Sequence, residues 1–231
     1  MRNIWTALLA AAALTRGAAA ATPGANCSRI VRVGTFDDGA PYVLAPATRW
    51  LDGGGACFAY YRQPSGARAL ELLGRGDLDL AFMGSMLWAR AVARGVGVTA
   101  VSVLMNLDES EGLVVDSTIT RLQDLRKKTL AAPYASTSHY IMLATIIEAG
   151  IDINEVTLLT ASPAKIMELW DAGVIDGAVC WGACFNHLLR PHGVKAPHGH
   201  LPGRVLVDAG TVARWGYVMF NRPGRDAFRE V

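Results

Sequence analysis

The sequence has few charges, few cysteines and, after its first residues, no long hydrophobic run. Of its 231 residues 18% are charged and 52% are hydrophobic, which excludes a disordered chain, because disordered chains are poor in apolar residues. Four cysteines are too few for a disulfide-rich miniprotein. The length suits one or two compact domains with a sizeable buried core.

Common catalytic motifs are also missing. The sequence contains no G-x-S-x-G, no H-E-x-x-H, no P-loop pattern and no G-x-G-x-x-G, so the corresponding hydrolase, metalloprotease and nucleotide-binding classes have no support. His139 stands beside Ser136 and Ser138 without an evident third member of a catalytic triad, and hydrogen bonding at a helix start is the alternative. We therefore expect no catalytic residue and no enzymatic activity.

Acidic residues are absent from the N-terminal segment, and the first is Asp37. Arg2 precedes an apolar run from Ile4 to Leu14, and the alanines at 19–21 offer an A-x-A cleavage pattern. This order predicts a secretory signal peptide over residues 1–21 and a secreted or periplasmic protein. An uncleaved anchor and an organelle transit segment are the alternatives, although the run is shorter than the roughly 20 residues that cross a bilayer.

No excess of basic charge remains once the leader is set aside. Residues 1–21 hold Arg2 and Arg16, which leaves 20 of the 22 basic residues against 20 acidic ones. A nucleic-acid-binding protein would present a basic stripe. We expect neither a nucleic-acid partner nor an anionic membrane surface.

The cysteines leave their pairing open. In an oxidising compartment Cys27 and Cys57 can pair, while unpaired or opportunistically paired cysteines are the alternative. Potential metal ligands fall within 21 residues, but their spacing matches no structural zinc pattern, and the segment also resembles a plain loop: Cys180, Cys184, His187, His192, His198 and His200. We expect no metal and no cofactor.

Short apolar runs alternate with amphipathic stretches, which predicts an α/β fold with mainly parallel sheets. The expected strands are Ile30–Thr35, Leu78–Met83, Val98–Leu104, Gly112–Val115, Thr129–Ala132, Val156–Leu159, Asp176–Cys180, Val205–Val207 and Tyr217–Phe220. The expected helices are Gly66–Leu73, Ser85–Ala93, Thr137–Ala149 and Pro163–Trp170.

A weak repeat links two parts of the chain. Gly76–Ala81 and Gly173–Ala178 both read G-x-x-D-x-A, and each ends a helix and starts a strand. Two similar lobes would explain this pattern, and the alternative is that such helix–Gly–strand turns are common. In open α/β sheets, ligands bind outside the carboxyl ends of the strands, so two lobes would enclose a cleft.

The turns from strand to helix hold the candidate site. Ser136, Thr137 and Ser138 lie where a strand ends and a helix starts, and unpaired N–H groups at such a start suit an anion without lysine or arginine. Helix capping alone is the alternative function of these hydroxyls. Gly84–Ser85 forms a second such turn, and Trp181 a third, where it is either a ligand platform or part of the core.

These motifs resemble those of the periplasmic substrate-binding proteins of ABC importers for taurine, alkanesulfonates and nitrate (SsuA-like proteins). The likeness runs from about residue 30 to 220 and is strongest for the taurine branch, in Pro133–Tyr140. It also covers Gly76–Asp79, Ser110–Val115 and Ile175–Ala178. The same superfamily includes pyrimidine-precursor proteins of thiamine synthesis.

The resemblance implies a two-lobed, type II periplasmic-binding fold that closes on a small anion or zwitterion. It implies lobe 1 over residues 28–110 and 217–231, and lobe 2 over residues 111–216. Matching positions imply a sulfonate held by helix N-termini, with Glu111 facing an ammonium group. The implied ligand-binding residues are Gly84, Ser85, Glu111, Ser136, Thr137, Ser138, His139 and Trp181.

The chain departs from the family pattern at two places. Trp215–Gly216 runs directly into Tyr217, without the aspartate-bearing loop of the taurine branch, so the resemblance implies a sulfonate as the ligand class. The chain stops at Val231, whereas relatives continue with further helices, so we expect the C-terminal part of the first lobe to be missing.

The resemblance implies a monomeric solute receptor that delivers a sulfonate such as taurine to an ABC permease. The alternatives are a protein like the thiamine pyrimidine-precursor synthases, which would need a cysteine-rich iron-binding stretch, and a truncated binding domain without a transport role.

Overall fold

The computed structural model describes residues 27–35, 55–190, 202–212 and 217–223, with side chains up to residue 212. The chain divides into two compact units. The first comprises Met1–Met83, Ala91–Ser102 and Phe220–Val231, and the second comprises Gly84–Arg90 and Val103–Met219. The expected signal peptide (1–21), the histidines at 192, 198 and 200, and Trp215–Gly216 lie outside the described residues.

The first sheet has the strand order β2-β1-β3-β10-β4. Strand β1 pairs in parallel with both β2 and β3. Two helices accompany these strands, α3 (Gly66–Gly74) and α4 (Ser85–Ala93). The strands are β1 (Arg29–Thr35), β2 (Ala56–Arg62), β3 (Leu80–Gly84), β4 (Val98–Asn106) and β10 (Tyr217–Pro223).

The second sheet has the strand order β7-β6-β8-β5-β9. Strand β6 is parallel to β7 and β8, whereas β5 is antiparallel to β8 and β9. The strands are β5 (Glu111–Val115), β6 (Thr129–Ala132), β7 (Thr157–Thr160), β8 (Gly177–Trp181) and β9 (Arg204–Asp208). The helices are α5 (Thr137–Glu148), α6 (Pro163–Asp171), α7 (Gly182–Leu189) and α8 (Ala209–Val212), with short 3₁₀ turns at Asp108–Ser110, Leu122–Leu125 and Ile153–Glu155.

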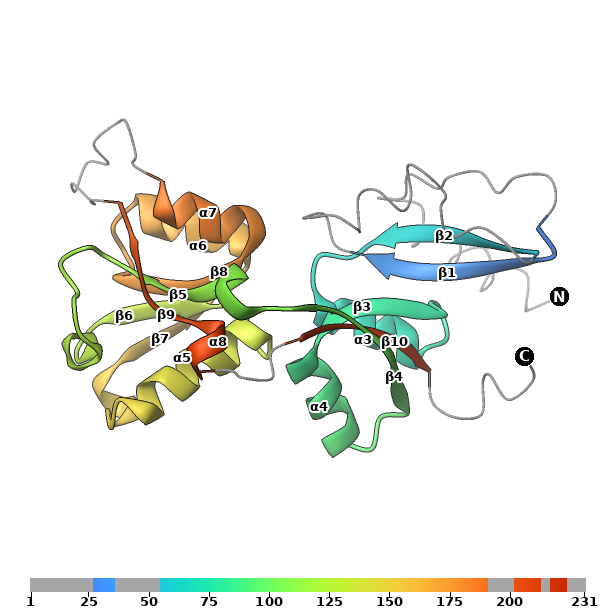
Figure 1. Ribbon diagram of the computed structural model, residues 1–231, viewed down its shortest axis with the longest axis horizontal. Helices are drawn as coiled ribbons and strands as arrows, with labels where there is room; N and C mark the ends of the chain where they lie inside the picture. The colour runs from blue at the N-terminus through green and yellow to red at the C-terminus, as the bar shows by residue number, and fades with distance from the viewer. Residues whose placement is uncertain (1–26, 36–54, 191–201, 213–216, 224–231) are drawn as a thin grey trace, which may run out of the picture. The chain divides into compact units, whose positions relative to one another are not determined.

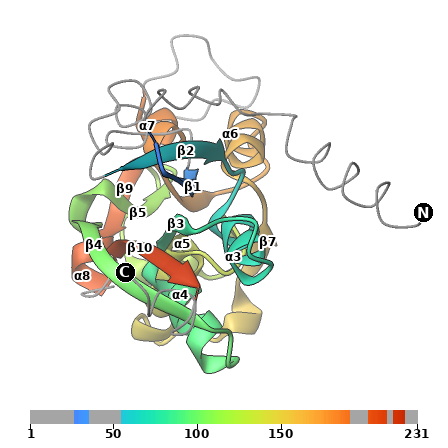
Figure 2. The same cartoon turned by 90° about the vertical axis from the view of Figure 1, so that its right-hand side faces the viewer.

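The three central strands of the second sheet, β6, β8 and β5, are buried on both faces, which explains their continuous apolar sequences. Alternate residues of a strand point to opposite faces. In β5, Leu113 and Val115 join the cluster that contains Ile141 of α5, while Val114 joins the cluster that contains Trp170 of α6. Figure 1 accordingly shows α5 on one side of this sheet and α6 with α7 on the other. Helices α6 and α7 pack against each other, and both lie in the upper part of the view in Figure 2, above α5.

The G-x-x-D-x-A repeat corresponds to one hydrogen-bonding arrangement that occurs in both units. The Asp79 amide donates to the Arg32 carbonyl, and Asp79 Oδ2 accepts from the Arg32 amide at 2.8 Å. Asp176 makes the same two bonds with Thr129, also with 2.8 Å to its Oδ2. Each aspartate thus holds the strand that follows it beside the first strand of its parallel pair. Because the two bonds join the residue just before β3 to β1, and the residue just before β8 to β6, they set the position at which β3 and β8 enter their sheets.

Every expected strand and helix is present, with ends that differ by at most a few residues. For three of the strands and α-helices, no residue range was predicted from the sequence. Strand β2 escapes detection because Ala56–Arg62 lacks a clear alternation, and α8 is too short to show a helical period. From the sequence, helix α7 was indicated only by the expected strand-to-helix turn at Trp181. Among the described residues, no helix has the length and apolar character needed to cross a membrane.

Candidate functional site

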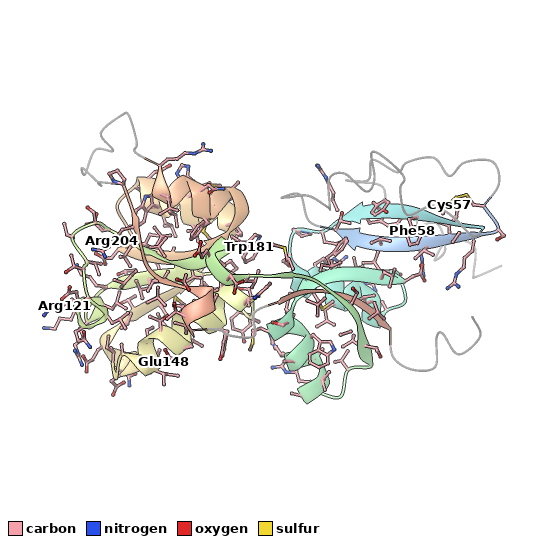
Figure 3. The ribbon with its side chains drawn as sticks, in the orientation of Figure 1. Cys57, Phe58, Arg121, Glu148, Trp181 and Arg204 are labelled. Carbon is pink, nitrogen blue, oxygen red and sulfur yellow. A yellow bond between two sulfur atoms is a disulfide. The ribbon has the colours of Figure 1, made fainter. Side chains whose placement is uncertain are left out.

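The candidate site lies at one edge of the second sheet. β6 and β8 end there, at Ala132 and Trp181, and lead into α5 and α7. Because β5 runs antiparallel to β8, it begins at this edge, and Glu111 is the register partner of Trp181. Figure 3 shows Trp181 at this end of β8, while Arg204 lies toward the far end of the sheet, where it pairs with Val115. Carboxyl ends of parallel strands are where α/β folds bind ligands.

Ser136 caps helix α5 with its side chain. The Ser136 hydroxyl accepts a hydrogen bond from the His139 amide at 3.2 Å and donates one to the Pro133 carbonyl at 2.6 Å. Ala135, immediately before the cap, has a φ of +58°, a left-handed conformation that is strained for alanine. The capping function expected for Ser136 is therefore confirmed, and the turn is held by its own hydrogen bonds.

The amides of Thr137 and Ser138 are unpaired. Among the described residues neither backbone N–H group donates a hydrogen bond, as expected for the first positions of a helix. Thr137 is 6% exposed, and Ser138 is fully buried. Together with the helix dipole, these donors give the start of α5 a partial positive charge that favours an anion.

Glu111 is a buried carboxylate beside this helix start. It is 1% exposed and accepts a hydrogen bond from the Ser138 hydroxyl. Burial raises the pKa of Glu111 to about 7, and the hydrogen bond from Ser138 opposes that rise. Since burial disfavours the charged form, Glu111 can be either neutral or ionised near neutral pH.

Gly84 lies against the hydroxyl of Thr137. A Cβ atom added to Gly84 would collide with Thr137 Oγ1, so only glycine permits this approach. Ser85 follows directly as the first residue of α4. The second expected turn, Gly84–Ser85, is thereby brought to the start of α5, although the two are about 50 residues apart in the sequence.

His139 takes part in the same turn. Its Nδ1 accepts a hydrogen bond from the Ala135 amide at 3.3 Å, and burial lowers its pKa. Both features favour the neutral imidazole, because a protonated ring has no acceptor nitrogen. The ring lies 5.5 Å from that of Tyr134, over which the Arg90 guanidinium sits at 5.2 Å. Hydrogen bonding at a helix start, the alternative stated for His139, is confirmed.

All four cysteines form disulfides. Cys27 pairs with Cys57, and Cys180 pairs with Cys184. The first pair was one of the possibilities stated from the sequence, whereas no particular partner was expected for Cys180 or Cys184. Within the described ranges, no group of histidine, cysteine and acidic side chains is placed to hold a metal ion.

Two residues near the site were missed from the sequence. Asp208, the last residue of β9, pairs in register with Gly112 and caps α8 by accepting from the Thr211 amide at 2.7 Å. The Asp-x-x-Thr spacing was an available capping signal. Arg90 was missed because no local pattern predicts that it meets Tyr134.

A known family matches most of this chain. The sequence profile described as NMT1/THI5 like matches residues 38–194. The chain belongs to the NMT1/THI5-like family. The amino-acid sequence is similar to that of the taurine-binding periplasmic protein of Escherichia coli, with 33% identity over 162 residues. It is also similar to a putative aliphatic sulfonates-binding protein of E. coli, with 26% identity over 134 residues.

The segment matched by the taurine-binding protein is 70% of this chain and 47% of that protein. The segment matched by the aliphatic sulfonates-binding protein is 57% of this chain and 42% of that protein. The chain therefore spans about half the length of these curated relatives.

Solved structures show the same fold. The periplasmic aliphatic sulphonate binding protein SsuA of E. coli aligns with a TM-score of 0.71 at 22% identity. The alkanesulfonate-binding protein SsuA of Xanthomonas axonopodis pv. citri, bound to MOPS, aligns with a TM-score of 0.68 at 23% identity. Each alignment covers 84% of this chain and 65% of the other. The expected family and the expected two-lobed periplasmic-binding fold are both confirmed.

Proposed function

We propose that this protein is the non-catalytic solute-binding component of an ABC-type import system and binds a small sulfonate, taurine being an example. The observation that carries the proposal is the pair of amides at Thr137 and Ser138, beside Gly84, which donate no hydrogen bond within the described part of the chain. The resemblance to proteins named for taurine and aliphatic sulfonates supports the ligand class. Periplasmic location, a monomeric state and delivery to a permease belong to the same proposal.

The chemistry of a sulfonate suits this helix start. A sulfonate has one negative charge spread over three oxygens, so it needs several donors and little counter-charge. The Thr137 and Ser138 amides supply two donors with the helix dipole behind them. The Thr137 hydroxyl supplies a third, beside Gly84. Ser136 acts indirectly in this proposal, because its hydroxyl already holds the turn.

A zwitterionic sulfonate would also use the other side of the site. Glu111, once ionised, attracts an ammonium group, and the Trp181 ring lies on the neighbouring strand at the same register. The attraction between opposite charges at short range is strong where water is excluded. The proposed arrangement thus places the anionic end at α5 and the cationic end at β5.

Binding of defined ligands tests this proposal. The full-length chain is exported, purified and titrated calorimetrically with taurine, ethanesulfonate, nitrate and the hydroxymethylpyrimidine precursor of thiamine, with melting curves recorded in parallel. We expect heat release and a higher melting temperature with the sulfonates, since a ligand at 100 times its Kd stabilises by about 2.7 kcal/mol. Silence toward both sulfonates would overturn the proposal, and a response to the pyrimidine alone would indicate the thiamine-related branch.

A further inference from the structure

The turn from β8 to α7 differs from other helix starts in this chain. Helices α3, α5 and α6 begin with a serine whose hydroxyl accepts a backbone N–H, at Ser65, Ser136 and Ser162. Helix α7 has Trp181 at that position, and no side chain caps it. The next residue, Gly182, has a φ of +57° and is exposed. This turn is therefore fixed neither by a capping side chain nor by burial of Gly182.

A disulfide closes the turn instead. Cys180, in β8, is joined to Cys184, in α7, with their Cα atoms 6.0 Å apart, and the bridge encloses Trp181, Gly182 and Ala183. Both cysteines are buried in the cluster that contains Trp170 and Leu188. The bridge therefore anchors the two ends of an exposed turn to the core of the second unit.

The disulfide encloses Trp181, which is a residue of the candidate functional site. Trp181 is half-buried and is the register partner of Glu111, while Cys180 pairs with Gly112. The Trp181 side chain makes no hydrogen bond to any of the described residues, so we infer that the direction of its ring follows the backbone of the turn. We propose that the Cys180–Cys184 disulfide is a positioning device that holds Trp181 at the ligand site, which makes ligand affinity depend on this bond.

The chain provides a matched control. The Cys27–Cys57 disulfide closes a loop with a separation of 30 residues, against 4 for Cys180–Cys184. In the chain-entropy account, the longer loop stabilises the fold more. Its cysteines connect a residue shortly before β1 to strand β2, both in the first unit, and neither is a residue of the candidate site. The two bonds should thus separate affinity from stability.

The inference rests on the proposed function, and its test compares two double variants with the parent protein. Cys180→Ala with Cys184→Ala should raise the Kd for ethanesulfonate about tenfold, as truncated aromatic anchors commonly do, with a small loss of melting temperature. Cys27→Ala with Cys57→Ala should lower the melting temperature more and leave the Kd unchanged. Cys180→Val with Cys184→Ala, which keeps the buried volume in β8, serves if the first variant does not fold.

A double-mutant cycle with Trp181→Ala decides whether the bond acts through Trp181. In the Trp181→Ala protein, loss of the Cys180–Cys184 bond should leave the Kd unchanged, because coupled residues are not additive. Equal Kd changes in both disulfide variants, an unchanged Kd without Cys180–Cys184, or an additive cycle each overturn the positioning function while sulfonate binding by the parent protein stands. If the parent protein binds neither ethanesulfonate nor taurine, both proposals fall.

Discussion

The hydroxyl of Ser138 donates a hydrogen bond to the buried carboxylate of Glu111. The contact joins the first turn of α5 to the first residue of β5, two elements separated by more than 20 residues of sequence. It places an acid that can ionise near neutral pH directly beside the amides proposed to bind an anion.

Stability should fall as the pH rises through neutrality because of Glu111. Folding raises its pKa from 4.5 to about 7, so the folded protein holds this proton more tightly than the unfolded chain. The stabilising contribution is complete below about pH 4.5 and is lost as the pH rises through about 7. At about 1.36 kcal/mol for each pKa unit, the loss is about 3 kcal/mol.

Urea unfolding on both sides of this window measures the effect. Glu111→Gln keeps an acceptor for Ser138 but cannot ionise, so its free energy of unfolding should decline less between about pH 5 and about pH 8 than that of the parent. All other ionisable groups are the same in the two proteins, so their contributions cancel in the comparison. Parallel pH profiles would show that Glu111 is not the group responsible.

Loss of the hydroxyls at the start of α5 should weaken sulfonate binding. Ser136→Ala with Thr137→Ala removes the cap and one proposed donor, and hydrogen bonds to charged groups are worth about 1.5–3 kcal/mol each. We expect the Kd for ethanesulfonate, measured by calorimetry, to rise several-fold or more.

Ser162→Ala is the matched control for the cap. Ser162 accepts from the Lys165 amide at 3.3 Å, as Ser136 accepts from His139 at 3.2 Å. Its loss should cost about 1 kcal/mol of stability and leave the Kd as it is. Equal Kd values in the parent and the Ser136→Ala, Thr137→Ala protein would remove this helix start from the proposed site.

Gly84→Ala should reduce affinity. The added methyl group meets Thr137 Oγ1, and the hydroxyl must move away from the proposed sulfonate position. The control is Gly74→Ala at the end of α3, where an added Cβ meets no atom within 4 Å; this change should be neutral or stabilise by about 0.5–1 kcal/mol. Calorimetry should show weaker binding only for Gly84→Ala, and an unaltered Kd there contradicts the close approach.

The aspartates of the repeat should matter for stability. Burial raises the pKa of Asp79, but the side-chain and backbone hydrogen bonds from Arg32 and its charge outweigh this and lower the pKa overall. Asp79→Ala leaves the Arg32 amide without its acceptor, so unfolding in urea should show a loss of about 1–3 kcal/mol.

Asp79→Asn should cost less than Asp79→Ala, because its side-chain oxygen can still accept from the Arg32 amide. Asp176→Ala and Asp176→Asn should follow the same order, since Asp176 accepts from the Thr129 amide in the same way. An alanine variant as stable as its asparagine counterpart would mean that the backbone hydrogen bond contributes nothing at that position.

Local patterns predicted the elements of this site well. The hydroxyl residues at 136–138 indicated the start of α5, and the structure has Ser136 as the cap and the helix over Thr137–Glu148. The repeat around Asp79 and Asp176 indicated two similar halves. Patterns of this kind succeed because helix caps and strand periods depend on residues a few positions apart.

Longer-range features could not be predicted in the same way. The Cys180–Cys184 bond was missed because a spacing of four suggests one helix face, whereas a strand end and a helix start contribute one cysteine each. The meeting of Arg90 with Tyr134 depends on contacts between segments distant in sequence. No local pattern indicated the nearly complete burial of Glu111, and burial is what raises its pKa.

The order of amino acids alone determined where strands and helices begin, which turns carry hydroxyls, and which family the chain belongs to, because these depend on neighbours along the chain and on shared motifs. The tertiary structure decided that Glu111 lies opposite Trp181 and under Ser138, and that glycine is required at position 84. The first relation arises only when β5 inserts antiparallel beside β8, since pairing in a sheet joins residues about 70 positions apart. The other two arise because the start of α5 meets β5 and Gly84, which are distant from it in the sequence.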